Sequence, residues 1–159
     1  MKHYFIINPV SGKNVPFDVM NDYIKPALEK TGVDYEIYET KCAGDATRFV
    51  RETLEASNGE KARFYGVGGD GTLYEVLNGA IGYDNAEITV VPKGSGNDWI
   101  RLFGDQQMFL DVEGLINGTP IKVDAIKCTH ENGVEYAINQ ASMGFDAEAC
   151  RKGQGCNCR

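Results

Sequence analysis

The sequence predicts an α/β fold, in which a parallel β-sheet lies between two layers of helices, followed by the beginning of an antiparallel β domain. Three observations support this prediction. Short apolar runs alternate with segments whose apolar residues recur at helical spacing. Turns rich in glycine follow several of the apolar runs. Near residue 121 the alternation stops, and two strand-like runs flank a turn. Alternating strands and helices are typical of a parallel sheet with right-handed crossovers.

The predicted elements follow in order along the chain. Buried-type apolar runs or polar–apolar alternation predict four strands, at His3 to Ile7, Asp34 to Thr40, Phe64 to Val67 and Glu87 to Val91. Helical spacing of apolar residues predicts helices over Pro16 to Lys30, after Gly44, after Gly71 and over Gln106 to Ile116. A hairpin is expected from Ile121 to Thr129 and from Val134 to Ser142, with no helix of its own to pack against.

The composition excludes several classes of function. The chain has 159 residues, enough for one well-cored domain, and a formal net charge of −7 with scattered basic residues, which argues against nucleic-acid binding. It has no apolar run long enough for a bilayer and no signal-peptide pattern, so we expect a cytoplasmic protein. The cysteines are expected to be free thiols rather than disulfides or a zinc site. They are Cys42, Cys128, Cys150, Cys156 and Cys158.

The turns that follow the predicted strands are expected to meet. The carboxyl ends of parallel strands share one edge of a sheet, and ligands bind beyond that edge. The turns concerned are Asn8 to Lys13, Thr40 to Gly44, Gly68 to Thr72 and Gly94 to Asp98.

The densest of these turns, Gly68-Gly69-Asp70-Gly71-Thr72, predicts a phosphate-sized loop between a strand and a helix. Its glycines allow backbone N–H groups to approach an anion closely. Asp70 would repel a bare phosphate, so either a divalent cation with its waters lies between them or Asp70 turns away to hold the loop. A tight turn without a ligand is the alternative.

Three motifs occur in order: Asn-Pro-x-Ser-Gly from Asn8, Gly-Gly-Asp-Gly-Thr-Leu-x-Glu from Gly68, and Pro-x-Gly-Ser-x-Asn-Asp from Pro92. The P-loop pattern is absent, and the weak dinucleotide-type pattern from Gly66 follows the third strand rather than the first. Together the motifs resemble the catalytic domain of the diacylglycerol kinase and sphingosine kinase family of lipid kinases. The last motif favours these enzymes over the related NAD kinases, which normally have Asn-x-Gly-x-x-Gly-Phe there.

The resemblance implies a kinase of lipid metabolism that transfers the γ-phosphate of ATP to a lipid hydroxyl, requires Mg²⁺ and touches the membrane peripherally and transiently. The ATP-binding residues that it implies are Asn8, Pro9, Ser11, Gly12, Thr40, Gly68, Gly69, Asp70, Gly71, Thr72, Glu75 and Ser95. The residues that it implies for holding Mg²⁺ through water are Asp70, Asp98 and Asp124. Purely structural roles remain open for each of them, such as a turn, a strand end, a helix cap or a solvated side chain.

The sequence departs from the family pattern at Tyr74, where asparagine is common, and at Ser95, which replaces the commoner threonine. Family members also continue into a β-rich second domain that supplies the acceptor pocket and the general base. We therefore expect residues 1–120 to form the ATP-binding domain and residues 121–159 to begin the second one, with no catalytic base in this chain. Two other functions stay open: an NAD kinase, and a silent binding module that associates through the exposed hairpin edge.

Overall fold

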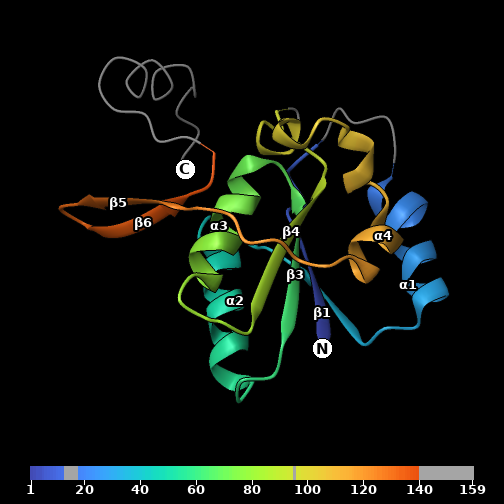
Figure 1. Cartoon of the computed structure of the whole chain (residues 1–159), viewed down its shortest axis with the longest axis horizontal. Coiled ribbons are helices and arrows are strands. Elements are labelled where there is room, and N and C mark those ends of the chain that lie inside the picture. The colour runs from blue at the N-terminus through green and yellow to red at the C-terminus, as the bar shows by residue number, and fades with distance from the viewer. Residues whose placement is uncertain (13–17, 95, 140–159) are drawn as a thin grey trace.

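The computed structural model describes residues 1–12, 18–94 and 96–139, and it contains a four-stranded parallel sheet. The strand order is β2-β1-β3-β4, and every neighbouring pair is parallel. The strands are β1 (Lys2–Ile7), β2 (Tyr35–Glu39), β3 (Ala62–Gly68) and β4 (Ala86–Pro92). Helices α1 and α4 cover one face of the sheet and α2 and α3 the other, as Figure 1 shows. The predicted three-layer α/β architecture is confirmed.

The helices are shorter and more divided than the periodicity predicted. They are η1 (Met20–Ile24), α1 (Lys25–Thr31), α2 (Asp45–Ala56), α3 (Asp70–Ala80), η2 (Trp99–Phe103), η3 (Gln106–Phe109) and α4 (Val112–Asn117). The single helix expected from Gln106 to Ile116 is wrong. Asp111 interrupts it, because its carboxylate accepts a hydrogen bond from the backbone N–H of Gly114 and so caps a new helix.

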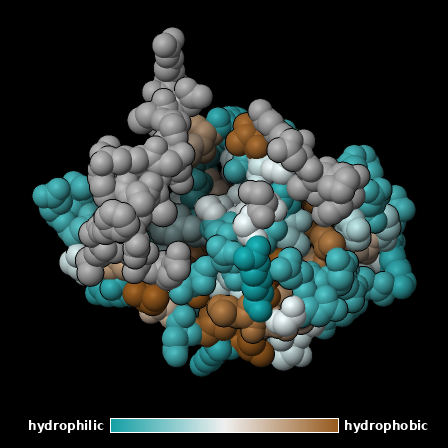
Figure 2. Space-filling model, turned by 90° about the horizontal axis from the view of Figure 1, so that it is seen from above, coloured by the Kyte–Doolittle hydropathy of each residue, from teal (hydrophilic) through white to brown (hydrophobic). Residues whose placement is uncertain are grey.

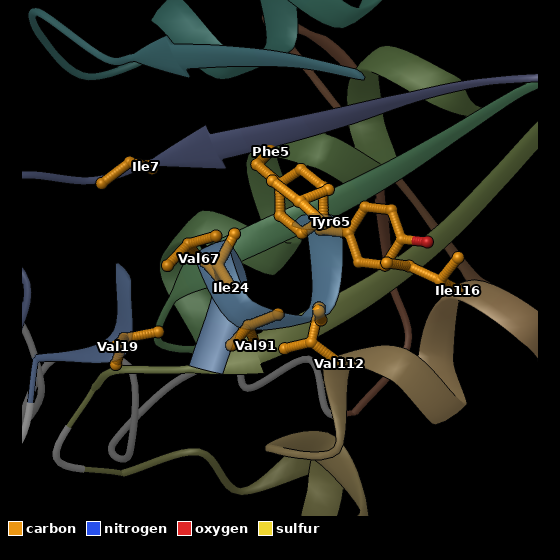
Figure 3. Packing of buried hydrophobic residues seen from close by; sticks show 11 residues of the cluster. Phe5, Ile7, Val19, Ile24, Tyr65, Val67, Val91, Val112 and Ile116 are labelled. Atoms are coloured by element: carbon orange, nitrogen blue, oxygen red, sulfur yellow. The ribbon is translucent and has the colours of Figure 1, made fainter. Parts of the chain in front are cut away.

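The core beneath α1 and α4 is built on alternate residues of β1, β3 and β4. Phe5 and Tyr65 stack with ring centroids 4.3 Å apart, and Val67 and Val91 extend this layer toward the carboxyl ends of the strands (Figure 3). Ile24 packs onto it from the helical side. Because β-strand side chains alternate between faces, the neighbouring residues of each strand point to the opposite layer.

The opposite face joins Ile6 and Phe64 of the sheet to Val50 of α2 and Val76 of α3. The two helices approach most closely at Gly79. A Cβ at this position would lie 2.7 Å from Cβ of Val50, which is closer than real side chains come. Glycine is therefore required for this helix contact, which fixes the position of α3 against α2.

Arg63 of β3 ties the sheet to the end of α4. Its side chain is 7% exposed and pairs with Glu87 of β4 at 2.7 Å. The same guanidinium donates to the backbone carbonyls of Leu115, Ile116 and Gly118. These carbonyls at a helix C-terminus have no partner within the helix, so the arginine supplies one.

The hairpin consists of β5 (Ile126–His130) and β6 (Gly133–Ala137) and extends beyond α3 (Figure 1). The expectation that it has no helix to pack against is wrong. The Asn78 side-chain amide of α3 accepts from the backbone N–H of Tyr136 and donates to its carbonyl, both at 2.9 Å. The expected strand at 121–125 is absent, and residues 140–142 lie outside the described part of the chain. Within the described residues, no helix is long and apolar enough to cross a membrane.

Candidate functional site

A cavity of about 470 Å³ opens at the carboxyl ends of β1, β2 and β3. Its wall consists of Asn8 to Ser11, Thr40 to Ala43, Ala46, Gly69, Gly71, Thr72, Tyr74 and Glu75. Figure 2 looks onto this end of the molecule, where hydrophilic residues predominate in the described surface and the centre is hollowed. Three turns that are far apart in the sequence therefore enclose one space, and its volume lies within the usual range for small-molecule sites.

The turn after β1 is fixed by Asn8. Its side-chain oxygen accepts from the backbone N–H of Val10 at 3.1 Å, which closes the turn. Its amide nitrogen approaches the hydroxyl of Thr72 at 3.4 Å and links the first turn to helix α3. Thr40 joins the second turn to the first, since its backbone N–H donates to the carbonyl of Ile7 at 2.9 Å.

The glycine-rich turn after β3 brings the N-terminus of α3 to the cavity. Gly69 is the N-cap residue, and no side chain of the described residues caps this helix end. The backbone N–H groups of Asp70 and Gly71 have no acceptor among the described residues. Such N–H groups and the helix dipole attract anions. This helix end is therefore an available anion-binding position.

The Asp70 carboxylate turns toward the loop after β4. It accepts from the backbone N–H groups of Asp98 and Trp99 at 3.0 and 3.2 Å. The two loops also touch at Gly94, where a Cβ would lie 2.5 Å from Cα of Gly69. Of the two orientations considered from the sequence, the structure has the one in which Asp70 holds the loops together.

The Glu75 carboxylate faces the loop after β2. Oε1 accepts from the backbone N–H of Gly44 at 3.0 Å and Oε2 from that of Ala46 at 3.1 Å. Beside them Asp45 is 5% exposed, and its pKa lies below the usual range because the backbone N–H of Lys41 and the Arg48 guanidinium both donate to it. This end of α2 therefore carries two hydrogen-bonded carboxylates.

The predicted site residues divide into three groups. Those that line the cavity are Asn8, Pro9, Ser11, Thr40, Gly69, Gly71, Thr72 and Glu75. Those that lie behind the cavity wall are Gly12, Gly68 and Asp70, which contact the loop after β4. Ser95 lies outside the described residues. Nucleotide binding by any of these residues stays a prediction.

The three acidic residues expected around Mg²⁺ do not form one cluster. Asp98 pairs with Arg101 at 2.8 Å, both oxygens of Asp70 accept backbone N–H groups, and Asp124 is exposed in the segment before β5. In the described part of the chain, no three His, Cys, Asp or Glu residues are placed to hold a metal ion. The described residues thus do not fit a preformed metal site, and a requirement for Mg²⁺ stays a prediction.

The wall also contains residues that were not among the predicted site residues: Val10, Lys41, Cys42, Ala43, Ala46 and Tyr74. The first four lie within the turns that were expected at this edge, which is the one signal that marked them. Tyr74 lies between the cavity and the hairpin, and partial burial together with a hydrogen bond to Glu135 raises its pKa to about 12. It is therefore protonated at neutral pH.

Comparison with known proteins agrees with this geometry. The family model of the diacylglycerol kinase catalytic domain matches residues 2–128. The diacylglycerol kinase of Bacillus subtilis is 33% identical over 142 residues, covering 87% of this chain and 44% of that protein. The diacylglycerol kinase of Staphylococcus epidermidis is 36% identical over 143 residues, covering 87% of this chain and 42% of that protein.

A solved structure shows the same architecture. The crystal structure of a diacylglycerol kinase from Bacillus anthracis aligns with a TM-score of 0.55 at 29% identity. The alignment covers 72% of this chain and 41% of that chain. The chain thus spans about half, or less, of the length of the relatives that it matches. Because the family model matches most of the chain, the chain belongs to the diacylglycerol kinase catalytic domain family.

Proposed function

We propose that this chain is the ATP-binding part of a lipid kinase that transfers the γ-phosphate of ATP to a lipid hydroxyl. The observation that carries the proposal is the cavity into which α3 presents an uncapped N-terminus. Phosphoryl transfer depends on positioning and on offsetting the phosphate charge, and backbone N–H groups supply both. A helix N-terminus contributes about 0.3–1 kcal/mol to the binding of a negative charge.

In this proposal the residues of the cavity have separate roles. The N–H groups of Asp70 and Gly71 donate to the phosphates, and the Thr72 hydroxyl, held near Asn8, orients them. Asp70 acts behind the wall, because its carboxylate keeps the loop after β4 against Gly69. Mg²⁺ would supply further positive charge on the triphosphate. No described residue is assigned as the base for the acceptor hydroxyl.

The first test is calorimetric titration of the chain with ATP and Mg²⁺. Gly71→Pro deletes one of the two proposed N–H donors, and proline is tolerated in the first turn of a helix. We expect it to weaken ATP binding on the order of tenfold, the loss typical of a hydrogen bond to a charged group, and to leave the weaker binding of adenosine unchanged. Gly71→Ala is the matched control, because it adds a Cβ that meets no protein atom within 4 Å and keeps the N–H, so the difference between the two variants measures the lost donor.

Two results would contradict the site. One is the absence of ATP binding by the folded wild-type chain. The other is equal loss of ATP and adenosine binding in Gly71→Pro, which would indicate a general disturbance of the cavity instead of a lost phosphate contact.

The second test concerns the acceptor. The chain is incubated with γ-labelled ATP, Mg²⁺ and either diacylglycerol in mixed micelles or NAD. Label in the lipid supports the proposal, and label in NAD would indicate an NAD kinase. Retained ATP binding without label in either acceptor would show that this chain alone does not catalyse the transfer. Membrane contact and self-association through the hairpin stay predictions.

A further inference from the structure

Two helix N-termini face the same cavity. The 12-residue helix α2 reaches it through Ala46, next to Ala43 of the preceding turn, and the 11-residue helix α3 through Gly71 and its N-cap residue Gly69. Each helix end carries partial positive charge and would attract a polyphosphate. The fold therefore offers two competing positions for the phosphate groups of one ligand, and something must select between them.

The N-terminus of α2 is already occupied by a carboxylate of this chain. Gly44, its N-cap residue, has a left-handed backbone with φ of 80° and offers no capping side chain. Glu75 of α3 replaces that cap from outside, with one oxygen on the N–H of Gly44 and the other on the N–H of Ala46. The N–H of Asp45 donates to the carbonyl of Cys42 at 3.3 Å. The N–H groups of Gly44, Asp45 and Ala46 thus each have an acceptor.

The contact between Glu75 and α2 also involves the backbone. The hydroxyl of Thr47, in the first turn of α2, donates to the carbonyl of Glu75 at 2.8 Å. Three hydrogen bonds therefore join this residue to the start of α2, and the cavity wall from Thr40 to Ala43 leads directly into it. Glu75 thus supports the end of that wall, in addition to the hydrogen bonds that the backbone N–H groups of Thr40 and Lys41 donate to Ile7 and Asp45.

The N-terminus of α3 differs from that of α2 in its cap and in the pairing of its first N–H groups. No described side chain caps it, and its own carboxylate, Asp70, is turned toward Asp98 and Trp99. Among the described residues, its first N–H groups have no acceptor. One helix end is filled by an anion and the other is open to a ligand.

We propose that Glu75 is a positioning residue that occupies the N-terminus of α2 and thereby directs the phosphates of a bound nucleotide to the N-terminus of α3. This inference rests on the proposed ATP site and specifies its polarity: phosphates at Gly69 and Gly71, the rest of the nucleotide along Thr40 to Ala43. Glu75 acts through the wall and does not touch the phosphates. Its role thus differs from the phosphate-enclosing role that the family resemblance implied.

The test is whether removing the carboxylate creates an anion site. Glu75→Ala leaves the N–H groups of Gly44 and Ala46 unpaired, so inorganic phosphate should bind there and raise the melting temperature of the variant. We expect this rise at millimolar phosphate to be larger in Glu75→Ala, which has two open helix N-termini, than in the wild type, which has one. The matched control is Glu29→Ala, which removes an exposed glutamate on α1. Potassium chloride at equal ionic strength separates specific binding from screening.

A second variant keeps the test decisive if Glu75→Ala does not fold. Glu75→Gln keeps the size and one acceptor oxygen, and its NH₂ group leaves one backbone N–H unpaired, so a smaller stabilisation by phosphate is expected. Destabilisation of both variants without rescue by phosphate would overturn the proposal, since a merely structural contact predicts that result. The phosphate readout requires no ATP binding, so it is independent of the titration that tests the proposed function.

With ATP as the ligand, Glu75→Ala should no longer restrict the phosphates to the N-terminus of α3. We expect its affinity for ATP to fall on the order of tenfold, because the wall is no longer fixed and a second helix end competes for the phosphates. Inorganic phosphate should compete with ATP more strongly in this variant than in the wild type. Unchanged ATP affinity and unchanged competition would contradict the positioning role.

Discussion

Two carboxylates on helix α3 illustrate how single residues shape the candidate site. Asp70 accepts backbone N–H groups of the loop after β4, and Glu75 accepts those at the start of α2. Both are acidic residues beside a cavity proposed for a polyanion, and both have their charge offset by N–H donors of the protein itself. A carboxylate near a phosphate site can thus serve to hold loops in place.

His3 allows a prediction about pH at the same scale. Its ring nitrogen Nδ1 lies 2.8 Å from the Tyr65 hydroxyl, the residue is 3% exposed, and burial lowers its pKa. As the pH falls below about 6.5, His3 becomes protonated in the unfolded chain but stays neutral in the folded chain, where its pKa is lower. The free energy of unfolding should therefore be lower at about pH 5.5 than at about pH 7, because the first value lies below the pKa of an unfolded histidine.

Urea unfolding at both pH values measures this dependence. His3→Phe should reduce the difference in unfolding free energy between the two pH values, while the loss of the Tyr65 contact lowers both values by the same amount. Parallel pH profiles of the wild type and His3→Phe would show that His3 is not responsible.

At the residue scale the sequence predicted the location of the site better than the roles of its members. Asn8, Thr40 and Thr72 were placed together because each follows a strand, and the carboxyl ends of parallel strands share an edge. The contact of Glu75 with Gly44 was not predictable, because it depends on how α2 and α3 pack. Sequence spacing alone does not encode that packing.

At the scale of elements, the contact between α2 and α3 determines where the site is formed. Gly79 lets the helices approach, and the resulting proximity places Glu75 against the first turn of α2. The alternation of strands and helices predicted these layers from the sequence. It failed for the expected helix at 106–116, because the capping side chain of Asp111 competes locally with helix continuation.

Gly79→Ala tests this contact. The added Cβ would meet Val50 and the carbonyl of Thr47 at 2.7 Å each, so the helices must separate. Overpacking of this kind typically costs about 1–3 kcal/mol, and we expect a loss of unfolding free energy in that range. Gly71→Ala in the same helix, whose Cβ meets no atom within 4 Å, should be neutral or stabilising. Urea denaturation compares the two, and equal stabilities would contradict the packing argument.

At the scale of the whole molecule, the candidate site and the hairpin occupy different positions relative to the sheet. The amino terminus lies at one end of the sheet (Figure 1), and the residues that line the cavity follow the opposite, carboxyl ends of the strands. The hairpin is attached to the side of α3 through Asn78, which pairs with Tyr136 as a neighbouring strand would. This attachment was not predictable, because a half-buried asparagine gives no signal of a partner 58 residues away.

Asn78→Ala should release the hairpin from α3 without unfolding the sheet. The backbone N–H of Tyr136 loses its acceptor, so its hydrogen exchange should accelerate, whereas the N–H groups of β3 should keep their protection. Exchange followed by NMR measures both in one sample. Unchanged protection of Tyr136 would mean that the hairpin is held by other contacts.

The strand order has a consequence for synthesis on the ribosome. Of the four described strands of this sheet, β1 is translated first, yet it occupies an interior position and pairs with both β2 and β3. Its second edge stays unpaired until Ala62 to Gly68 have been translated, so the nascent segment around β1 carries exposed apolar surface throughout that interval. Chaperones that recognise extended apolar segments are therefore expected to bind before the glycine-rich turn after β3 is translated.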